Sequence, residues 1–136
     1  MLRSALSAFF NSLPTTKVTA HCVGPCGVYD PESARIGAEA VLSMTKKRIA
    51  LEPPQSNDAA RWATYNNTFA RYVAIKEDQA KETKTELLIL WTDYFKPEHL
   101  EKHPNIHDLF WNATKKAGEA KKTEDPSVGE ELLKLI

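Results

Sequence analysis

The chain has 136 residues, of which 42% are hydrophobic, and this is enough for one compact domain with a modest core. Its 18 basic and 18 acidic side chains cancel, which argues against nucleic acid, an anionic membrane surface or an acidic substrate as a partner. No apolar run approaches the roughly 20 residues that a membrane-spanning helix requires, so we expect a soluble protein.

Residues 1–20 have the features of a leader that is removed on maturation. They contain a short apolar patch at 5–10 and end in the small residues Thr19 and Ala20. The patch is shorter than the roughly 7 to 15 apolar residues of a secretory signal, which favours a cytoplasmic protein over an exported one. The alternative is an amphipathic first helix, at 2–13, that stays in the mature protein.

The following segment, 21–31, concentrates donor atoms for a metal. His21, Cys22 and Cys26 offer one imidazole and two thiols within six residues, and the chain has no other cysteine. A disulfide scaffold would spread its cysteines to close long loops, so metal or redox chemistry is the better prediction. Zinc fits less well, because a structural zinc site needs about four side chains in tetrahedral array.

Cleavage before His21 would complete a different donor set. The free amine of His21, the backbone amide of Cys22 and the thiolates of Cys22 and Cys26 could form four near-planar donors, an arrangement that favours nickel or copper. The His21 imidazole would then be left to bind from the axial direction. Because a peptide nitrogen is a poor donor, the site would stay inactive until a leader peptidase cuts the precursor.

The remaining sequence predicts helices and almost no strands. Caps and first-turn prolines begin four expected helices, which span Pro31 to about Leu51, Asp58 to Phe95, Pro104 to Ala120 and Pro126 to Ile136. Pro97 is expected to end the second of them. Apolar residues recur at three- and four-residue steps in each, so we expect an all-α antiparallel four-helix bundle at 32–136 behind an N-terminal metal-binding hook at 21–31. The fourth helix is short, so that oligomer contacts or a missing tail must complete the core.

The apolar stripes also predict which side chains are buried. The core candidates are Ala34, Ala38, Val41, Leu42 and Ile49 in the first helix, Trp62, Tyr65, Phe69, Tyr72, Val73, Leu87, Leu88 and Trp91 in the second, Ile106, Leu109, Phe110, Ala113 and Ala117 in the third, and Val128, Leu132, Leu133 and Ile136 in the fourth. Each stripe is expected to be core rather than a cofactor site.

Two motifs resemble those of one known family. The segment H-C-x-x-P-C-G-V-Y-D-P, from His21 to Pro31, closely resembles the nickel hook of nickel superoxide dismutases, and 91–97 resembles that family's second recognisable stretch. The resemblance implies an enzyme that converts superoxide to oxygen and hydrogen peroxide, with one nickel ion per subunit cycling between Ni(II) and Ni(III). It also implies a homohexamer of four-helix bundles.

The resemblance assigns roles to five residues. It implies that nickel is held by the amine and imidazole of His21, the amide and thiolate of Cys22 and the thiolate of Cys26. Tyr29 matches a tyrosine that gates the open face of the metal, and Tyr94 matches a second tyrosine near it.

Two positions depart from the family's pattern, in which a glutamate of the first helix and an arginine of the second steady the axial histidine. Ungapped registers place Gly37 and Gln79 there, so both members of that charge pair are replaced together. We therefore expect an axial contact that is weaker or that uses another carboxylate. Glu39 is not assumed to replace the lost one.

Two other classes of protein stay open at this stage. One is a non-catalytic carrier, in which the same hook binds nickel or copper without turnover. The other is a dithiol redox protein, in which Cys22 and Cys26 form a disulfide reversibly and activity needs no metal.

A second group of possible metal ligands lies further along the chain. His99, His103 and His107 share a four-residue spacing, which suggests a zinc stripe along one helix. Pro104 falls between them and would interrupt that helix, so we interpret all three as surface or cap residues.

Overall fold

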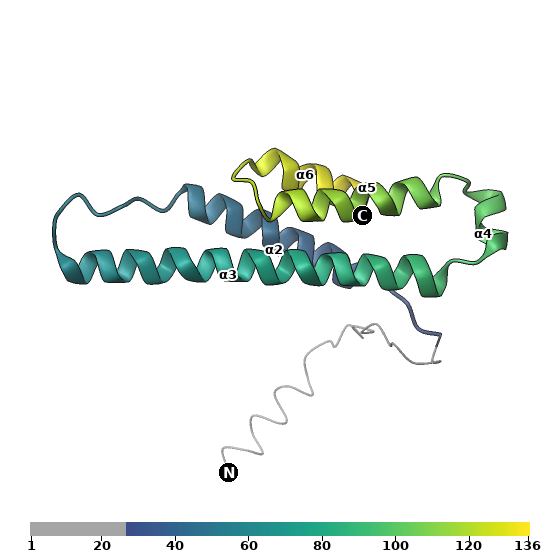
Figure 1. The fold of residues 1–136 in the computed structure, drawn as a ribbon, viewed down its shortest axis with the longest axis horizontal. Helices are drawn as coiled ribbons and strands as arrows, with labels where there is room; N and C mark the ends of the chain where they lie inside the picture. The colour runs from purple at the N-terminus through teal and green to yellow at the C-terminus, as the bar shows by residue number, and fades with distance from the viewer. Residues whose placement is uncertain (1–26) are drawn as a thin grey trace, which may run out of the picture.

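The fold is that of a computed structural model, described for residues 27–136 (Figure 1). The elements in chain order are α2 (Glu32–Ile49), α3 (Ala59–Ile89), the π-helix η1 (Leu90–Tyr94), α4 (Pro97–Lys102), α5 (Ile106–Ala120) and α6 (Pro126–Leu135). The four predicted helices are all present, which confirms the all-α fold. The predictions for the leader and for His21, Cys22 and Cys26 lie outside the described residues.

Aspartate side chains cap the first turns of three helices, as their positions in the sequence suggest. Asp30 accepts a hydrogen bond from Glu32 N at 2.9 Å, next to the start of α2. Asp58 accepts from Ala60 N at the same distance in α3, and Asp125 accepts from Ser127 N in α6. Each carboxylate satisfies a backbone N–H that has no partner within its helix.

The long helix α3 is the spine of the bundle. In Figure 1, α2 runs antiparallel to it and crosses it obliquely, while α5 and α6 lie along its second half. The core consists of two clusters: Ala38, Val41, Ala80, Ala117, Ala120, Val128 and Leu132 form the first, and Ala34, Leu87, Leu90, Ile106, Phe110 and Ala113 form the second. Ten of the 22 predicted core residues are buried in these clusters, and Trp91, Leu133 and Ile136 pack against them. Ile49, Leu88 and Leu109 were also predicted to be buried but are exposed.

The first half of α3 departs from the prediction, because nothing in 59–75 is buried. This half extends beyond α5 and α6, and only α2 and the 50–58 loop lie beside it (Figure 1). Trp62 is 37% exposed and donates from Nε1 to the Ser56 carbonyl oxygen at 2.9 Å. Its ring meets Tyr65 at 5.7 Å, and the guanidinium of Arg48 lies 4.6 Å from the Phe69 ring centroid. These aromatic residues contact one another along the surface of α3 instead of forming part of the core.

A glycine allows α2 and α3 to approach closely at their crossing. A Cβ added to Gly37 would overlap the Thr83 hydroxyl and lie 3.2 Å from the Gln79 carbonyl oxygen. Gly37 and Gln79 are the two positions where the family's charge pair was expected. The structure brings them together, in backbone contact and without room for a side chain at position 37.

A buried lysine ties the turn between α5 and α6 to the spine. Lys76 is 2% exposed, and its Nζ donates to the Thr123 carbonyl oxygen and lies 3.2 Å from Glu124 Oε1. Glu124 also pairs with Arg48 at 2.8 Å, which connects the end of α2 to the same turn.

The short helix α4 was not predicted. Pro97 was expected only to end the long helix, but it also begins α4, because proline suits the first turn of a helix. The helix ends at Lys102 and α5 begins at Ile106, so the three histidines do not share a helix. In 27–136 no group of three metal-binding side chains lies close enough to hold an ion. No helix among these residues is long and apolar enough to cross a membrane.

Candidate metal centre

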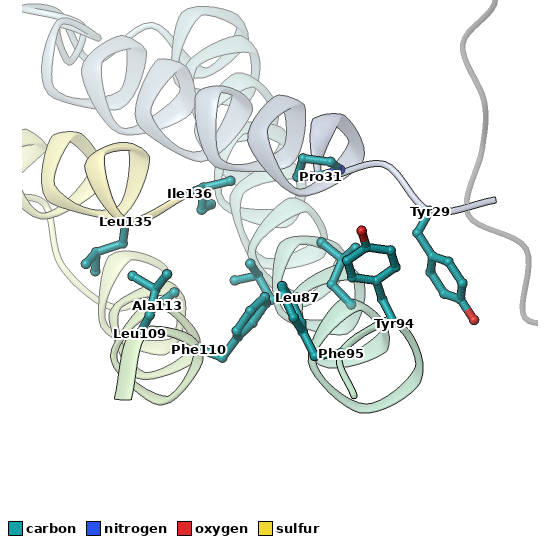
Figure 2. A pocket seen from close by; sticks show the side chains of 11 residues that line it. Tyr29, Pro31, Leu87, Tyr94, Phe95, Leu109, Phe110, Ala113, Leu135 and Ile136 are labelled. Carbon is teal, nitrogen blue, oxygen red and sulfur yellow. The ribbon is translucent and has the colours of Figure 1, made fainter. Parts of the chain in front are cut away.

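The described part of the site is built around two tyrosines from distant parts of the chain. Tyr29 lies in the extended segment before α2, and Tyr94 is the last residue of η1. Their ring centroids are 5.5 Å apart, with the rings tilted by 55°. The Tyr94 hydroxyl lies on the side of Pro31, while the Tyr29 hydroxyl points away from the pocket (Figure 2). The structure therefore brings together the two tyrosines that were predicted to act together.

The π-helix explains why Tyr94 faces outward at this point. The wider turn of η1 changes the register of the side chains that follow it, and such turns occur frequently at functional sites. Trp91 stacks on Phe110 with centroids 6.2 Å apart, and Phe95 meets the same ring at 5.3 Å. Both therefore pack inward, whereas Tyr94 remains 44% exposed beside Tyr29.

His99 supports Tyr94 from α4. The two rings are stacked, with centroids 5.6 Å apart and planes 17° apart, and His99 Nδ1 accepts a hydrogen bond from Lys96 N at 3.0 Å. The interpretation of His99 as a cap residue is confirmed. Its contact with Tyr94 was missed, and the signal was available: His99 stands at the third position of a turn that begins with Pro97.

An apolar pocket of about 300 Å³ lies behind the tyrosines. Tyr29, Pro31 and Tyr94 line one end, and the side chains of Phe110, Ala113, Leu135 and Ile136 are among those at the other (Figure 2). Apart from the two phenols, no lining side chain carries a nitrogen, oxygen or sulfur atom. The pocket therefore has no ligands for a metal ion, and a metal beside the tyrosines would need donors from elsewhere in the chain.

The donors that suit nickel occur in the hook. Both cysteines of the chain lie there, and thiolate, amine and imidazole groups together fit a nickel ion better than any group of side chains in 27–136. Tyr29 follows Cys26 by three residues, so one member of the tyrosine pair belongs to the hook segment itself.

Charged residues on the first turns of α2 are already engaged with one another. Arg35 forms ion pairs with Glu32 and Glu39, and the hydrogen bond from Arg35 lowers the pKa of Glu32. The same contacts raise the pKa of Arg35 above its ordinary value. Glu39 is 53% exposed and bound to Arg35, which agrees with leaving it out of the metal site.

Comparison with known proteins connects these features. The family model described as nickel-containing superoxide dismutase matches residues 16–136. The nickel superoxide dismutases of Streptomyces seoulensis and Streptomyces coelicolor are 42% and 40% identical to this chain over 123 residues, which cover 90% of it and 85% of each relative. A native nickel superoxide dismutase structure superposes with a TM-score of 0.70 at 37% identity, covering 85% of this chain and 89% of that one. The chain therefore belongs to the nickel-containing superoxide dismutase family.

Proposed function

We propose that this nickel superoxide dismutase holds its metal, one ion per subunit, through His21, Cys22 and Cys26. When bound, nickel supplies the one-electron chemistry, alternating between Ni(II) and Ni(III) as superoxide is converted to oxygen and hydrogen peroxide. The observation that supports this ligand set most directly is the Tyr29–Tyr94 pair, because Tyr29 belongs to the hook segment and contacts Tyr94 of the bundle. The only two cysteines stand immediately before it.

We assign separate tasks to the two phenols. Tyr29 is three residues from the last thiolate and controls access to the open face of the metal. Tyr94, held against Tyr29 on one side and stacked on His99, orients substrate or ordered water beside it. The apolar pocket behind them limits water on the inner side of the pair, so that polar contacts to a small anion come from the phenols and the hook.

Maturation would divide the chain into a leader at 1–20, the hook at 21–31 and the bundle at 32–136. Cleavage before His21 is required in this proposal, because it converts a peptide nitrogen into an amine that can bind nickel. The family model starts to match at residue 16, so most of the proposed leader lies outside it. A leader peptidase acting in the cytoplasm would complete the site.

A homohexamer is the proposed assembly. Large apolar side chains on the surfaces of α2, α3 and α5 support contacts between subunits, since Ile36, Ile49, Trp62 and Trp111 are each between 37% and 55% exposed. The short α6 covers only part of the bundle, which makes such contacts more important for stability.

The carrier and the dithiol alternatives are not favoured. Both named relatives are superoxide dismutases, and their matches cover most of the chain. A carrier would also have no use for the paired phenols of Tyr29 and Tyr94.

Substitution of single thiols tests the ligand set. The chain starting at His21 should bind one nickel and dismutate superoxide, while Cys22→Ser and Cys26→Ser should each lose dismutation. Full activity in either variant would contradict the hook, and activity in metal-free protein would support the dithiol alternative. An uncleaved precursor as active as the mature chain would exclude the amine as a ligand.

A further inference from the structure

A second pocket, separate from the tyrosine pair, is a groove between α3 and α5, which lie side by side (Figure 1). It has a volume of about 640 Å³ and is open to the surface. Four lysines line it: Lys84 of α3, Lys115 of α5, and Lys121 and Lys122 of the turn that follows α5. Glu119 is the one carboxylate among the described residues of its lining. The groove therefore has a local excess of positive charge, although the 18 basic and 18 acidic side chains of the whole chain balance.

The carboxylates near the groove are bound to particular lysines. Glu119 pairs with Lys116, which lies outside the groove, at 2.8 Å. Glu77 pairs with Lys121 at 3.1 Å. Neither carboxylate is left to neutralise the other lysines of the groove.

Three of the four lysines keep an unpaired charge. Within 27–136, Lys84, Lys115 and Lys122 form no ion pair, and all three are exposed. The ammonium group of Lys115 lies 4.6 Å from the centroid of the Trp111 ring, a contact that holds the group in place without removing its charge. Like charges that share one groove repel one another, so an anion between them would stabilise this arrangement.

The end of α5 explains only part of the cluster. Cations stabilise the C-terminus of a helix, an effect that is limited to about its last turn, and Lys121 and Lys122 lie there. Lys115 is more than one turn before the end of α5, and Lys84 belongs to the interior of α3. These two lysines therefore need a different explanation.

Gly118 leaves room between the lysines. It follows Lys115 by three residues and precedes Lys121 and Lys122 by three and four, so all four positions share one side of α5. A Cβ at position 118 would meet nothing within 4 Å, which means that packing does not require a glycine. Glycine inside a helix is less stable than alanine, and space for a ligand would account for its presence here.

The turn at one end of the groove is fixed by contacts with α3. Lys76 donates a hydrogen bond to the carbonyl oxygen of Thr123, and Glu77, the next residue, holds Lys121. Both contacts are present without a ligand. A groove that is formed in advance loses less conformational entropy when it binds.

We propose that this groove binds a small phosphate-bearing anion with two or more negative charges. Lys84 meets the anion from α3, Lys115 and Lys122 meet it from the α5 side, and Gly118 provides the space. Lysine ammonium groups bind phosphate oxygens as point charges and need no fixed geometry. Three unpaired cations suit an anion with several charges better than superoxide, which has one, so this site is distinct from the site of dismutation.

The test is calorimetric titration of the full chain with inorganic pyrophosphate at about 0.15 M salt, where distant surface charges are screened. One pyrophosphate should bind per chain. Lys84→Gln and Lys122→Gln should each weaken binding about threefold to fivefold, because each removes one exposed ion pair with the ligand. Lys134→Gln is the matched control: it removes the same charge from an exposed position on α6, outside the groove, and should leave the dissociation constant unchanged.

Gly118→Gln tests the shape of the groove without changing its charge. The new side chain enters open space, so circular dichroism should show a folded protein, but pyrophosphate binding should weaken. A parent chain that does not bind pyrophosphate, or equal weakening by Lys134→Gln and Lys84→Gln, would overturn the proposed site. Binding to vesicles that contain phosphatidic acid, without binding to pyrophosphate, would overturn the assignment to a free anion.

Discussion

Gly37 and Thr83 meet where α2 crosses α3, and their contact leaves no space for a side chain at position 37. The Thr83 hydroxyl would overlap a Cβ there, and the Gln79 carbonyl oxygen lies 3.2 Å from the same point. A larger side chain at position 37 and this close helix crossing exclude each other.

The first prediction concerns this crossing. Gly37→Ala should reduce the free energy of unfolding by about 1–3 kcal/mol, because the added methyl group overpacks the interface. Thr83→Ala should recover part of the loss in the double variant, since it removes the overlapping hydroxyl. Gly118→Ala in α5 is the control: its Cβ would meet nothing within 4 Å, and the helix should gain up to about 1 kcal/mol. Urea unfolding of all four proteins measures these differences.

Lys76 supplies a second prediction about stability. Lys76→Met keeps the volume of the side chain but removes the donor to the Thr123 carbonyl oxygen, so the protein should lose about 1–3 kcal/mol of stability. Lys84→Met, at an exposed position on the same helix, should stay within about 0.5 kcal/mol of the parent. Equal unfolding midpoints for the two variants would show that the Lys76 contact does not hold the α5–α6 turn.

The tyrosine pair leads to a prediction about activity. Tyr94→Phe should lower dismutation up to about tenfold, because it removes a hydroxyl whose hydrogen bond to substrate or ordered water contributes about 1 kcal/mol. His99→Phe keeps a ring against Tyr94, whereas His99→Asn keeps an acceptor for Lys96 N but loses the ring. We expect the Asn variant to lose more activity than the Phe variant. The reverse order would mean that the cap of α4, rather than ring stacking, positions Tyr94.

The helix caps give the prediction for pH. Hydrogen bonds from Ser127 lower the pKa of Asp125, and the bond from its backbone N–H contributes more than the one from its side chain. A carboxylate with a lowered folded pKa stabilises the protein above its unfolded pKa, and this stabilisation is lost as the pH falls through the folded value. Asp125→Ala should therefore be less stable than the parent at neutral pH, and the difference should shrink below about pH 4. A difference in urea midpoint that is constant from pH 7 to pH 3 would contradict the role of the charge.

Much of the fold follows from local sequence signals, because caps, prolines and apolar steps act over a few residues. Asp58, Pro97 and Asp125 all mark helix starts in the structure, although Pro97 was interpreted only as a stop. The exposure of the aromatic side chains in the first half of α3 could not be predicted from these local signals. Its aromatic stripe is as regular as the rest, and only the shorter lengths of α5 and α6 leave it uncovered.

The site shows a similar division. The hook motif identifies the metal chemistry and leads to Tyr29 and Tyr94, which the structure brings within 5.5 Å of each other. The position of His99 in the first turn of α4 is a local signal for a cap, but its contact with Tyr94 depends on how η1 and α4 are arranged.

The most direct test of the metal site is the paramagnetic resonance spectrum of the chain that begins at His21, loaded with nickel and oxidised, recorded with its rate of superoxide dismutation. Binding through the amine and imidazole of His21 and the thiolates of Cys22 and Cys26 predicts an active protein whose rhombic Ni(III) signal is split by one axial nitrogen. Bound nickel with neither the signal nor the activity would contradict this ligand set.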